Sequence, residues 1–219
     1  MVYRMVSKTI GRNPVRVQVP SSAHMNKINH EIDKVNLAYV IGVAMGDGNL
    51  SNPNSRAIRL RVTCDNKYPK LIRNIIFSIQ KLLPINKVST VKRGDNCVDI
   101  SCYSNKLEEF LGWKVGFGSK YKQKISVPDW IKNKRKFTIS CLKGLFETDG
   151  SIYMDRKYLM VGFVTIIPTL AKDVMEMIKS LGFKPNLQKI KREDQKTRYN
   201  VRISKDTEKF IKLINIIKK

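Results

Sequence analysis

A short motif occurs twice in this chain, and its repetition constrains the fold more than any other feature of the sequence. The first copy is Val40–Leu50, the second is Leu142–Ser151, and each contains the pair Asp-Gly near its end. Asp47 and Asp149 are 102 residues apart. Each copy is apolar and stops at a glycine, which is typical of a helix end because glycine adopts the left-handed conformation beyond the last turn. The sequence therefore predicts one structural unit written twice.

Small residues recur at a spacing of four within each copy. Gly42 and Gly46 share one face of the first expected helix, and Gly144 and Thr148 share one face of the second. A face without bulky side chains lets two helix backbones approach closely. If the helices pack through these faces, the two aspartates end side by side, where they repel each other and face an unfavourable helix dipole. Such a pair requires cations, and acids that share divalent metals hydrolyse phosphodiesters.

The two copies, at this spacing, resemble the paired motifs of the LAGLIDADG homing endonucleases in their single-chain form. The resemblance covers nearly all of the chain after about residue 30. It implies an α+β fold with two pseudo-symmetric αββαββα halves, whose antiparallel four-stranded sheets form a DNA-binding saddle. We expect a basic N-terminal arm over residues 1–30, a first repeat with its linker over 31–130, and a second repeat over 131–219.

Hydrophobic periodicity gives the expected elements. The first motif helix spans 31–50 with Asn36 as its N-cap, 49–55 is a polar loop, and 57–64 alternates like a half-buried strand with a basic outer face. An internal match pairs Val98–Ser101 with Val201–Ser204 at an offset of 103. The other expected elements are a helix at 68–83, strands at 87–93 and 97–102, helices at 105–113 and 138–149, a hairpin at 151–165 with its turn near 155–157, a helix at 170–181, strands at 186–192 and 198–204, and a final helix at 206–217.

The net charge of the chain limits the classes of molecule that it is expected to bind. Forty-two lysines and arginines against 18 acids give a net charge of +24, which indicates a polyanionic partner such as nucleic acid. A solubilising surface or thermal adaptation is the alternative explanation. No apolar stretch could span a bilayer and none marks a signal peptide. We therefore expect no membrane partner and an intracellular location, in the cytoplasm, the nucleoid or an organelle.

Basic and polar residues along the expected strands and loops are candidates for DNA contact. A two-stranded ribbon fits the major groove, lysines bind phosphates in a salt-dependent way, and arginine suits guanine. The alternative for each residue is a solvated outer face. The candidates are Asn49, Arg59, Arg61, Lys87, Lys92, Arg93, Lys120, Lys122, Arg156, Lys157, Lys189, Lys191, Arg198 and Arg202.

The resemblance implies that Asp47 and Asp149 are catalytic metal ligands, one for each DNA strand cleaved, with the backbone carbonyls of Gly46 and Thr148 as further ligands. Hard oxygen ligands suit Mg²⁺, and Mn²⁺ or Ca²⁺ would substitute for it in binding. The competing interpretation is that each aspartate only belongs to a turn that ends a helix. Glu147, which has Met45 at the matching position of the first copy, is interpreted as structural.

The resemblance also implies a lysine beside these acids. Lys120, Lys122 and Lys124 compete for this role in the segment 118–128, and we prefer Lys124. The second half offers no equivalent segment, so its lysine stays unassigned and the two sites are expected to be unequal.

Together these observations predict a monomeric, site-specific endonuclease that makes a double-strand break in a long DNA target by Mg²⁺-dependent hydrolysis and is encoded by an intron. The alternative is an RNA maturase, with intron RNA as its partner, or a catalytically silent relative that binds DNA or RNA. An intein-embedded nuclease is disfavoured because no splicing-domain residues flank the motifs.

Overall fold

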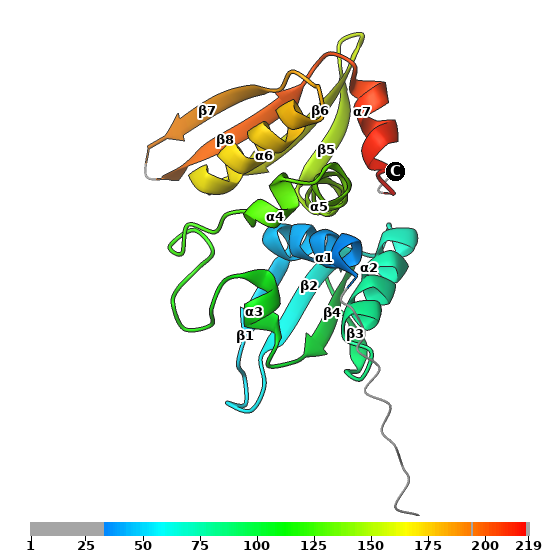
Figure 1. Ribbon diagram of the computed structural model, residues 1–219, viewed down its shortest axis with the longest axis vertical. Coiled ribbons are helices and arrows are strands. Elements are labelled where there is room, and N and C mark those ends of the chain that lie inside the picture. The colour runs from blue at the N-terminus through cyan, green and yellow to red at the C-terminus, as the bar shows by residue number, and fades with distance from the viewer. Residues whose placement is uncertain (1–32, 194, 218–219) are drawn as a thin grey trace, which may run out of the picture. The chain divides into compact units, whose positions relative to one another are not determined.

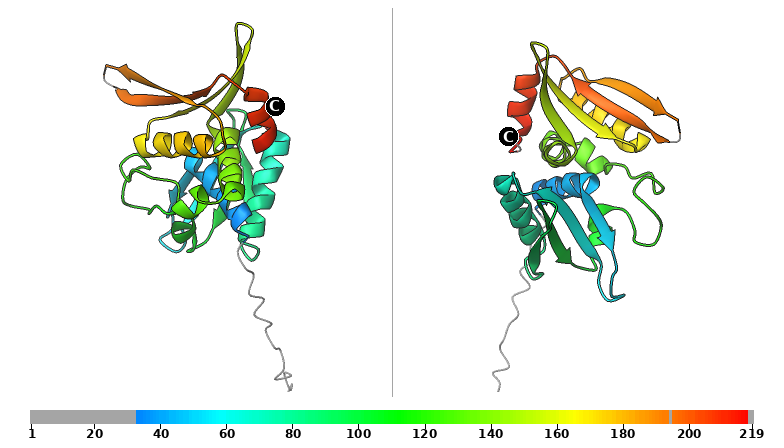
Figure 2. Two further views of the ribbon diagram at one scale, coloured as in Figure 1. Left: turned by 45° about the horizontal axis from the view of Figure 1, so that its top comes forward. Right: turned by 180° about the vertical axis from the view of Figure 1, so that it is seen from behind.

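The structure, a computed structural model, describes residues 33–193 and 195–217, so the predicted N-terminal arm lies outside the described residues. Two central helices, α1 (Lys34–Gly46) and α5 (Arg135–Thr148), pack against each other between two four-stranded antiparallel sheets (Figure 1). The other two views show the same layering (Figure 2). The predicted α+β class with two antiparallel sheets is confirmed.

The first sheet has the strand order β1-β2-β4-β3. Its buried side chains alternate along β2 and β4, which gives the sheet one core face and one outer face. In chain order, the elements of this half are α1, β1 (Gly48–Ser51), β2 (Arg59–Asp65), α2 (Pro69–Leu82), β3 (Val88–Lys92), β4 (Cys97–Tyr103) and α3 (Leu107–Leu111).

The second sheet repeats the topology of the first, with the order β5-β6-β8-β7. Within the described part of the chain, no helix is both long and apolar enough to cross a bilayer. The elements of this half are α4 (Asp129–Lys132), α5, β5 (Gly150–Asp155), β6 (Tyr158–Thr165), α6 (Pro168–Ser180), β7 (Asn186–Arg192), β8 (Gln195–Ile203) and α7 (Thr207–Ile214).

The strand register corrects the predicted internal alignment. Val62 and Phe163 are equivalent, since each lies opposite the glycine of its Asp-Gly pair. Val62 also lies opposite Ile100, and Phe163 lies opposite Val201. Ile100 and Val201 are therefore equivalent at an offset of 101, and the predicted offset of 103 is wrong by two residues. Because side chains alternate with a period of two, the error left the predicted faces unchanged.

Several predicted boundaries were wrong for local reasons. Asp33 caps α1, since its side chain accepts hydrogen bonds from the backbone N–H groups of Val35 and Asn36, and Asn36 lies inside the helix. Residues 48–51 form β1, where the end of the motif helix and the start of a polar loop were expected, because pairing with β2 outweighs the weak strand propensity of Gly-Asn-Leu-Ser. The second motif helix begins at Arg135, three residues before its predicted start, and α4 was not predicted.

The predicted close contact between the motif helices is confirmed. A Cβ added to Gly42 would lie 2.2 Å from a carbonyl oxygen of α5, and one added to Gly144 would lie 2.4 Å from a carbonyl oxygen of α1. At the end of the helices, a Cβ on Gly46 would lie 2.0 Å from the side-chain oxygen of Thr148. The two backbones therefore touch along one face, and no side chain fits between them there.

A buried polar group ties the same helices together. Glu147 on α5 is fully buried, and it accepts hydrogen bonds from the Tyr39 hydroxyl of α1 at 2.7 Å and from the Ile217 backbone N–H at 2.8 Å. The Lys143 ammonium lies 3.9 Å from the same carboxylate. Burial, together with the negative charge of Glu147, raises the pKa of Tyr39. These contacts hold Glu147 within the core, as its interpretation as a structural residue requires.

We expect Gly42→Val to destabilise the protein by about 1–3 kcal/mol, because the new side chain meets a helix backbone that cannot rotate away. Urea unfolding followed by circular dichroism measures the change. Gly94→Ala is the control, since a Cβ there meets nothing within 4 Å, and we expect it to shift stability by less than about 0.5 kcal/mol. Equal unfolding midpoints for the two variants would contradict the close helix contact.

Candidate active site

The two aspartates of the repeated motif lie at equivalent helix ends. Asp47 is the C-cap of α1 and Asp149 is the C-cap of α5, with nearly identical backbone angles of φ −85°, ψ 2° and φ −90°, ψ 0°. A Cβ added to Gly46 would lie 3.3 Å from Oδ2 of Asp149, so this carboxylate lies against the residue that precedes Asp47. The helix contact therefore brings the two acids to one place, as the small-residue pattern predicts.

Lys120, from the linker between the halves, places a cation at the same point. Its ammonium donates hydrogen bonds to the carbonyl oxygens of Ala44 at 3.2 Å, of Met45 at 2.7 Å, and of Gly46. These carbonyls belong to the last turn of α1 and lie at the negative end of its dipole. Burial lowers the pKa of Lys120, and the charges of the two aspartates act in the opposite direction.

The geometry favours Lys120 over Lys124, which we preferred from the sequence. Lys124 is exposed, on a turn where its backbone is left-handed with φ 49°, and Lys122 is exposed as well. Lys120 is the member of the three whose ammonium contacts α1. The sequence could not choose among them, because this linker has no helix or strand periodicity to indicate which way each side chain points.

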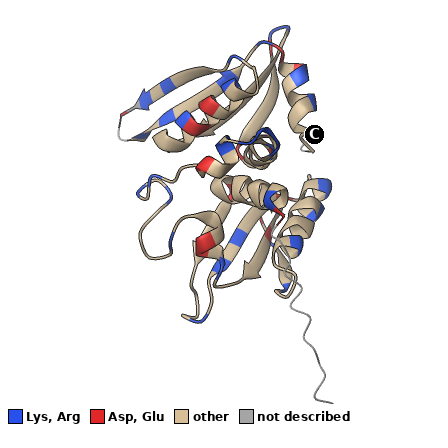
Figure 3. Cartoon of the chain, viewed as in Figure 1, with Lys and Arg blue, Asp and Glu red and all other residues tan. Residues whose placement is uncertain are grey.

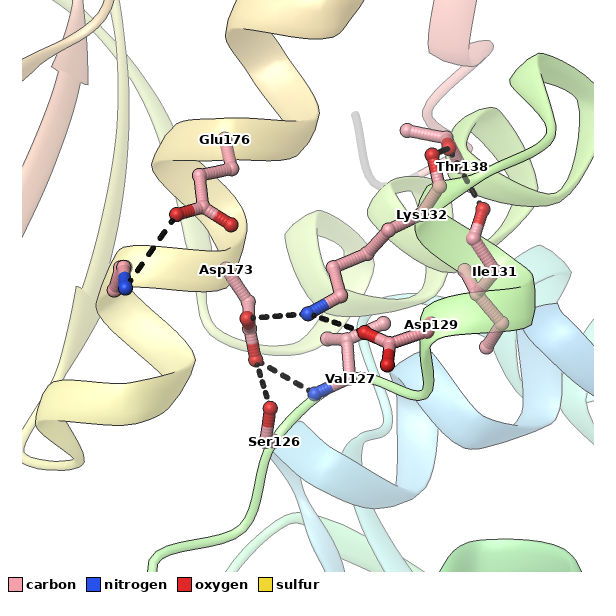
Figure 4. Close-up of polar contacts among 9 residues, drawn as sticks. Ser126, Val127, Asp129, Ile131, Lys132, Thr138, Asp173 and Glu176 are labelled. Carbon is pink, nitrogen blue, oxygen red and sulfur yellow. Dashed lines mark hydrogen bonds and ion pairs between the residues drawn. The ribbon is translucent and has the colours of Figure 1, made fainter.

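The linker that carries Lys120 is anchored to the second half through α6. Asp173 on α6 is buried, and its carboxylate accepts hydrogen bonds from the Ser126 hydroxyl and the Val127 backbone N–H, both at 2.7 Å (Figure 4). The Lys132 ammonium lies 3.1 Å from the other oxygen of Asp173 (Figure 4). This network fixes the segment that follows Lys120 and so helps to hold the lysine at the end of α1.

A cavity of about 470 Å³ opens beside Asp149, and its lining includes three cations among apolar residues. Lys120, Lys196 and Arg198 all border it, and the Lys196 ammonium lies 4.3 Å from the centroid of the Tyr121 ring, a cation–π distance. Sequence reasoning missed Lys196, because the last strand was expected to begin at residue 198, whereas β8 begins at Gln195 and includes Lys196. Three cations beside a carboxylate can bind the phosphate of a nucleic acid.

The oxygen atoms at the helix ends match the ligands of a hard divalent cation. Two carboxylates and two main-chain carbonyls, those of Gly46 and Thr148, are the donor types that Mg²⁺ and Ca²⁺ prefer. Across residues 33–193 and 195–217, no group of three or more histidine, cysteine, aspartate or glutamate residues could hold a metal ion. The donor chemistry of the paired helix ends therefore fits magnesium, which needs few protein ligands because it retains several waters.

The predicted DNA contacts on the first sheet divide between its two faces. Asn49 lies opposite Arg61, and Arg59 follows on the same outer face, away from the buried Leu60. Arg61 lies 3.8 Å from Asp99, which orients its guanidinium.

The other candidates of the first half are not strand residues of this outer face. Lys92 lies opposite the buried Val98 and so points to the other face. Of the remaining candidates, Lys87 is exposed just before β3, and Arg93 is exposed just after it and pairs with Asp95 and Asp99.

The second sheet shows the same division. Figure 3 shows lysine and arginine along β7 and β8. Arg198 and Arg202 lie on the face opposite to the buried Val201. Lys189 lies opposite Tyr199, on the same face as Val201, so it does not share a face with the arginines. Lys191 lies at a register irregularity between positions 190 and 192. Arg156 and Lys157 are exposed in the two-residue turn between β5 and β6.

Comparison with protein families gives two matches that together cover more than half of the chain. The LAGLIDADG-like domain family matches residues 136–215. The WhiA LAGLIDADG-like domain family matches residues 36–106. An uncharacterized protein of Methanocaldococcus jannaschii is 28% identical over 125 residues, which are 55% of this chain and 43% of that protein. The match to this curated relative thus spans less than half of its length.

Solved structures share the fold at low sequence identity. The homing endonuclease I-DmoI, in complex with DNA and Mn, matches with a TM-score of 0.59 and 22% identity over 83% of this chain and 96% of that chain. Its complex with DNA and Ca matches equally well, with a TM-score of 0.59 and 22% identity over 84% of this chain and 91% of that chain. The N-terminal LAGLIDADG domain of WhiA matches with a TM-score of 0.56 and 14% identity over 84% of this chain and 83% of that chain.

We expect Asp173→Ala to lower the free energy of unfolding by about 3 kcal/mol, because it leaves the Lys132 ammonium and two other donors without their buried acceptor. Asp129→Ala is the matched control, since Asp129 binds the same ammonium at 3.0 Å but its side chain is 85% exposed. Exposed pairs contribute at most about 1 kcal/mol. Thermal unfolding of both variants measures the difference, and equal losses of stability would contradict the anchoring role of Asp173.

Proposed function

The chain belongs to the LAGLIDADG family, and on that premise we propose that it is a site-specific DNA endonuclease. The observation that carries this proposal is the juxtaposition of two acids at the ends of two helices whose backbones touch, with a lysine bonded to the same helix end. Two carboxylates that end equivalent helices each lie at the negative end of a helix dipole, which is unfavourable for a negative charge. Their value is in chemistry that needs negative oxygen ligands.

In this proposal, Asp47 and Asp149 hold Mg²⁺ together with the backbone carbonyls of Gly46 and Thr148, one acid serving each DNA strand. Magnesium, when bound, would lower the pKa of a coordinated water molecule and stabilise the negative charge on the phosphate under attack. The Lys120 side chain extends from the linker to the helix ends. There its positive charge offsets the two carboxylates and can orient water. Lys196 binds the DNA backbone at the cavity beside Asp149.

The outer faces of the two sheets provide the specificity in this proposal. Asn49, Arg59 and Arg61 on the first sheet, and Arg198 and Arg202 on the second, read base edges in the major groove. Lysines in the loops bind phosphates and strengthen affinity at low salt. The complexes of I-DmoI with DNA support a duplex as the partner, and we extend the proposal to a monomer encoded by an intron. We also propose the repeat boundaries 31–130 and 131–219, which meet within the short helix α4 (Asp129–Lys132).

A second candidate function has one observation in its favour. The first half matches the WhiA LAGLIDADG-like domain, and a relative of that kind would bind DNA or RNA without cutting it. An RNA maturase that binds its host intron belongs to the same alternative. Both acids remain at the helix ends, which favours the nuclease, because binding to a polyanion alone would be weakened by two carboxylates at the centre of the interface.

The nuclease proposal is tested with a plasmid that carries the joined sequences on either side of the host intron. We expect the wild-type protein to linearise it with Mg²⁺, and we expect Asp47→Asn and Asp149→Asn to slow cleavage by at least about 1000-fold while binding is kept, because the lost carboxylates are metal ligands. Asp129→Asn, at an exposed position, is the control. Binding of this DNA without any cleavage by wild type would favour the WhiA-like alternative, and unchanged cleavage by Asp47→Asn would refute the assigned site.

The choice between the two linker lysines generates a separate expectation. Lys120→Met should slow cleavage by about 100-fold, as the loss of a positioned cation or proton donor does, whereas Lys124→Met should stay within about twofold of wild type. Single-turnover rates at saturating protein separate this effect from weaker DNA binding. If Lys124→Met proves the slower variant, our preference from the sequence was correct and the geometric assignment is wrong.

A further inference from the structure

The linker between the halves displays an aromatic ring that the proposed chemistry does not use. Phe117 is 69% exposed and lies between Gly116 and Gly118, whose φ angles of 84° and 88° are left-handed. A non-glycine residue rarely adopts such angles, so the two glycines allow the chain to turn sharply on both sides of the ring. The ring is therefore carried at the tip of a tight loop. We define this Phe117 loop as Lys114–Gln123.

The Phe117 loop is braced by its own hydrogen bonds. The Gln123 amide donates to the carbonyl oxygens of Lys114 at 2.8 Å and Gly118 at 2.9 Å, and its Oε1 accepts from the Lys114 backbone N–H at 3.0 Å. The Val115 N–H donates to the carboxylate of Glu108 on α3 at 2.7 Å. A ring held out by a braced loop costs little additional entropy when it enters a binding partner.

The surroundings of the ring are those of a surface that meets a polyanion. From Phe110 to Pro128 the sequence has no acidic residue and four lysines: Lys114, Lys120, Lys122 and Lys124. The Lys114 ammonium lies 5.7 Å from the centroid of the Phe117 ring. An apolar ring in a lysine-rich segment is unsuited to docking against an apolar protein surface, because burying the lysine ammonium groups there carries a large desolvation cost.

The loop also lies at the candidate active site. Ser119, Lys120 and Tyr121 border the cavity beside Asp149, and Lys120 reaches the end of α1. Phe117 precedes Lys120 by three residues, which limits the distance between their Cα atoms to about 11 Å. Figure 1 shows the linker between α3 and α4 as a long loop on the side of the molecule where α1 ends. The ring is thus within reach of DNA that is bound across the two acids.

Exposure alone would not carry an inference, since single apolar residues on a surface are common. Phe77 on α2 shows this, because it is 67% exposed but lies on an amphipathic helix remote from the linker in sequence. Phe117 differs from Phe77 in its glycine-flanked tip, its braced loop, its cations and its place beside the acids. These four features together distinguish a presented ring from an incidental one.

We propose that Phe117 is a wedge that inserts between base pairs of bound duplex DNA near the cleavage position, entering from the minor groove and bending the duplex. This inference rests on the proposed function, since it takes duplex DNA as the partner. Apolar side chains that enter the minor groove unstack a base step and kink DNA by about 20–90° toward the major groove. Lysines beside such a side chain contact the phosphates that flank the groove it enters.

The test uses the full chain and a duplex that the wild-type protein selects, with Ca²⁺ present, from a pool of random-sequence DNA. Energy transfer between dyes at the two DNA ends measures the bend, and 2-aminopurine placed at successive positions reports unstacking. We expect wild type to bend the duplex and raise emission at one step. Phe117→Ala should abolish both signals while it weakens binding by no more than about tenfold, and Phe117→Leu, which keeps an apolar wedge, should retain part of both.

Phe77→Ala is the matched control and should behave like wild type. A bend and an emission signal that survive in Phe117→Ala would overturn the wedge and leave the proposed nuclease standing. Failure of wild type to select any duplex would contradict the proposed function, and the wedge with it. Equal loss of the signals in Phe117→Ala and Phe77→Ala would also overturn the inference, because it would show a general effect of removing an exposed ring.

Discussion

The arrangement depends on one contact, the approach of the α1 backbone to the α5 backbone along a face without side chains. Gly42 and Gly144 place each helix against a carbonyl group of the other, and Gly46 leaves room for Thr148. In a small protein, helix axes are normally separated by interdigitating side chains. Without those side chains, the contact between the two backbones fixes the distance between the helix ends. The Asp-Gly pairs lie at these ends, so the same contact fixes the distance between them. Helix packing therefore brings the two acids together.

The same contact creates an electrostatic problem that other elements address. Two carboxylates and two helix C-termini concentrate negative charge at one point. Lys120 brings a positive charge to that point from a linker that has no regular structure, and Asp173 on α6 holds the linker in place. Burial lowers the pKa of Lys120, and the charges of the two acids oppose that shift. The linker is therefore part of the candidate site, although it contributes few residues to either sheet.

The sequence contained enough information for the fold but only part of the candidate site. The repeated motif predicted two helices in backbone contact and the meeting of Asp47 and Asp149, because small residues and a terminal Asp-Gly are local features that a single chain displays. It did not identify Lys120 over Lys124, since the direction of a side chain in an aperiodic linker depends on tertiary anchors such as Asp173. The sequence also could not show that Lys189 and Arg198, both candidates for DNA contact, lie on different faces of the sheet, because strand pairing and its irregularity near position 190 leave no mark on residue types. Likewise β1 is a strand because of its partner, and its own residues read as a loop.

We propose that helix packing makes Asp47 and Asp149 into one shared cation site. Anomalous X-ray scattering from crystals grown with Mn²⁺ is the decisive test of this site. We expect strong anomalous peaks at the paired helix ends, within about 2–2.5 Å of carboxylate oxygens of both aspartates. Crystals in which the two carboxylates lie apart, or in which manganese binds elsewhere and leaves both acids without a peak, would contradict it.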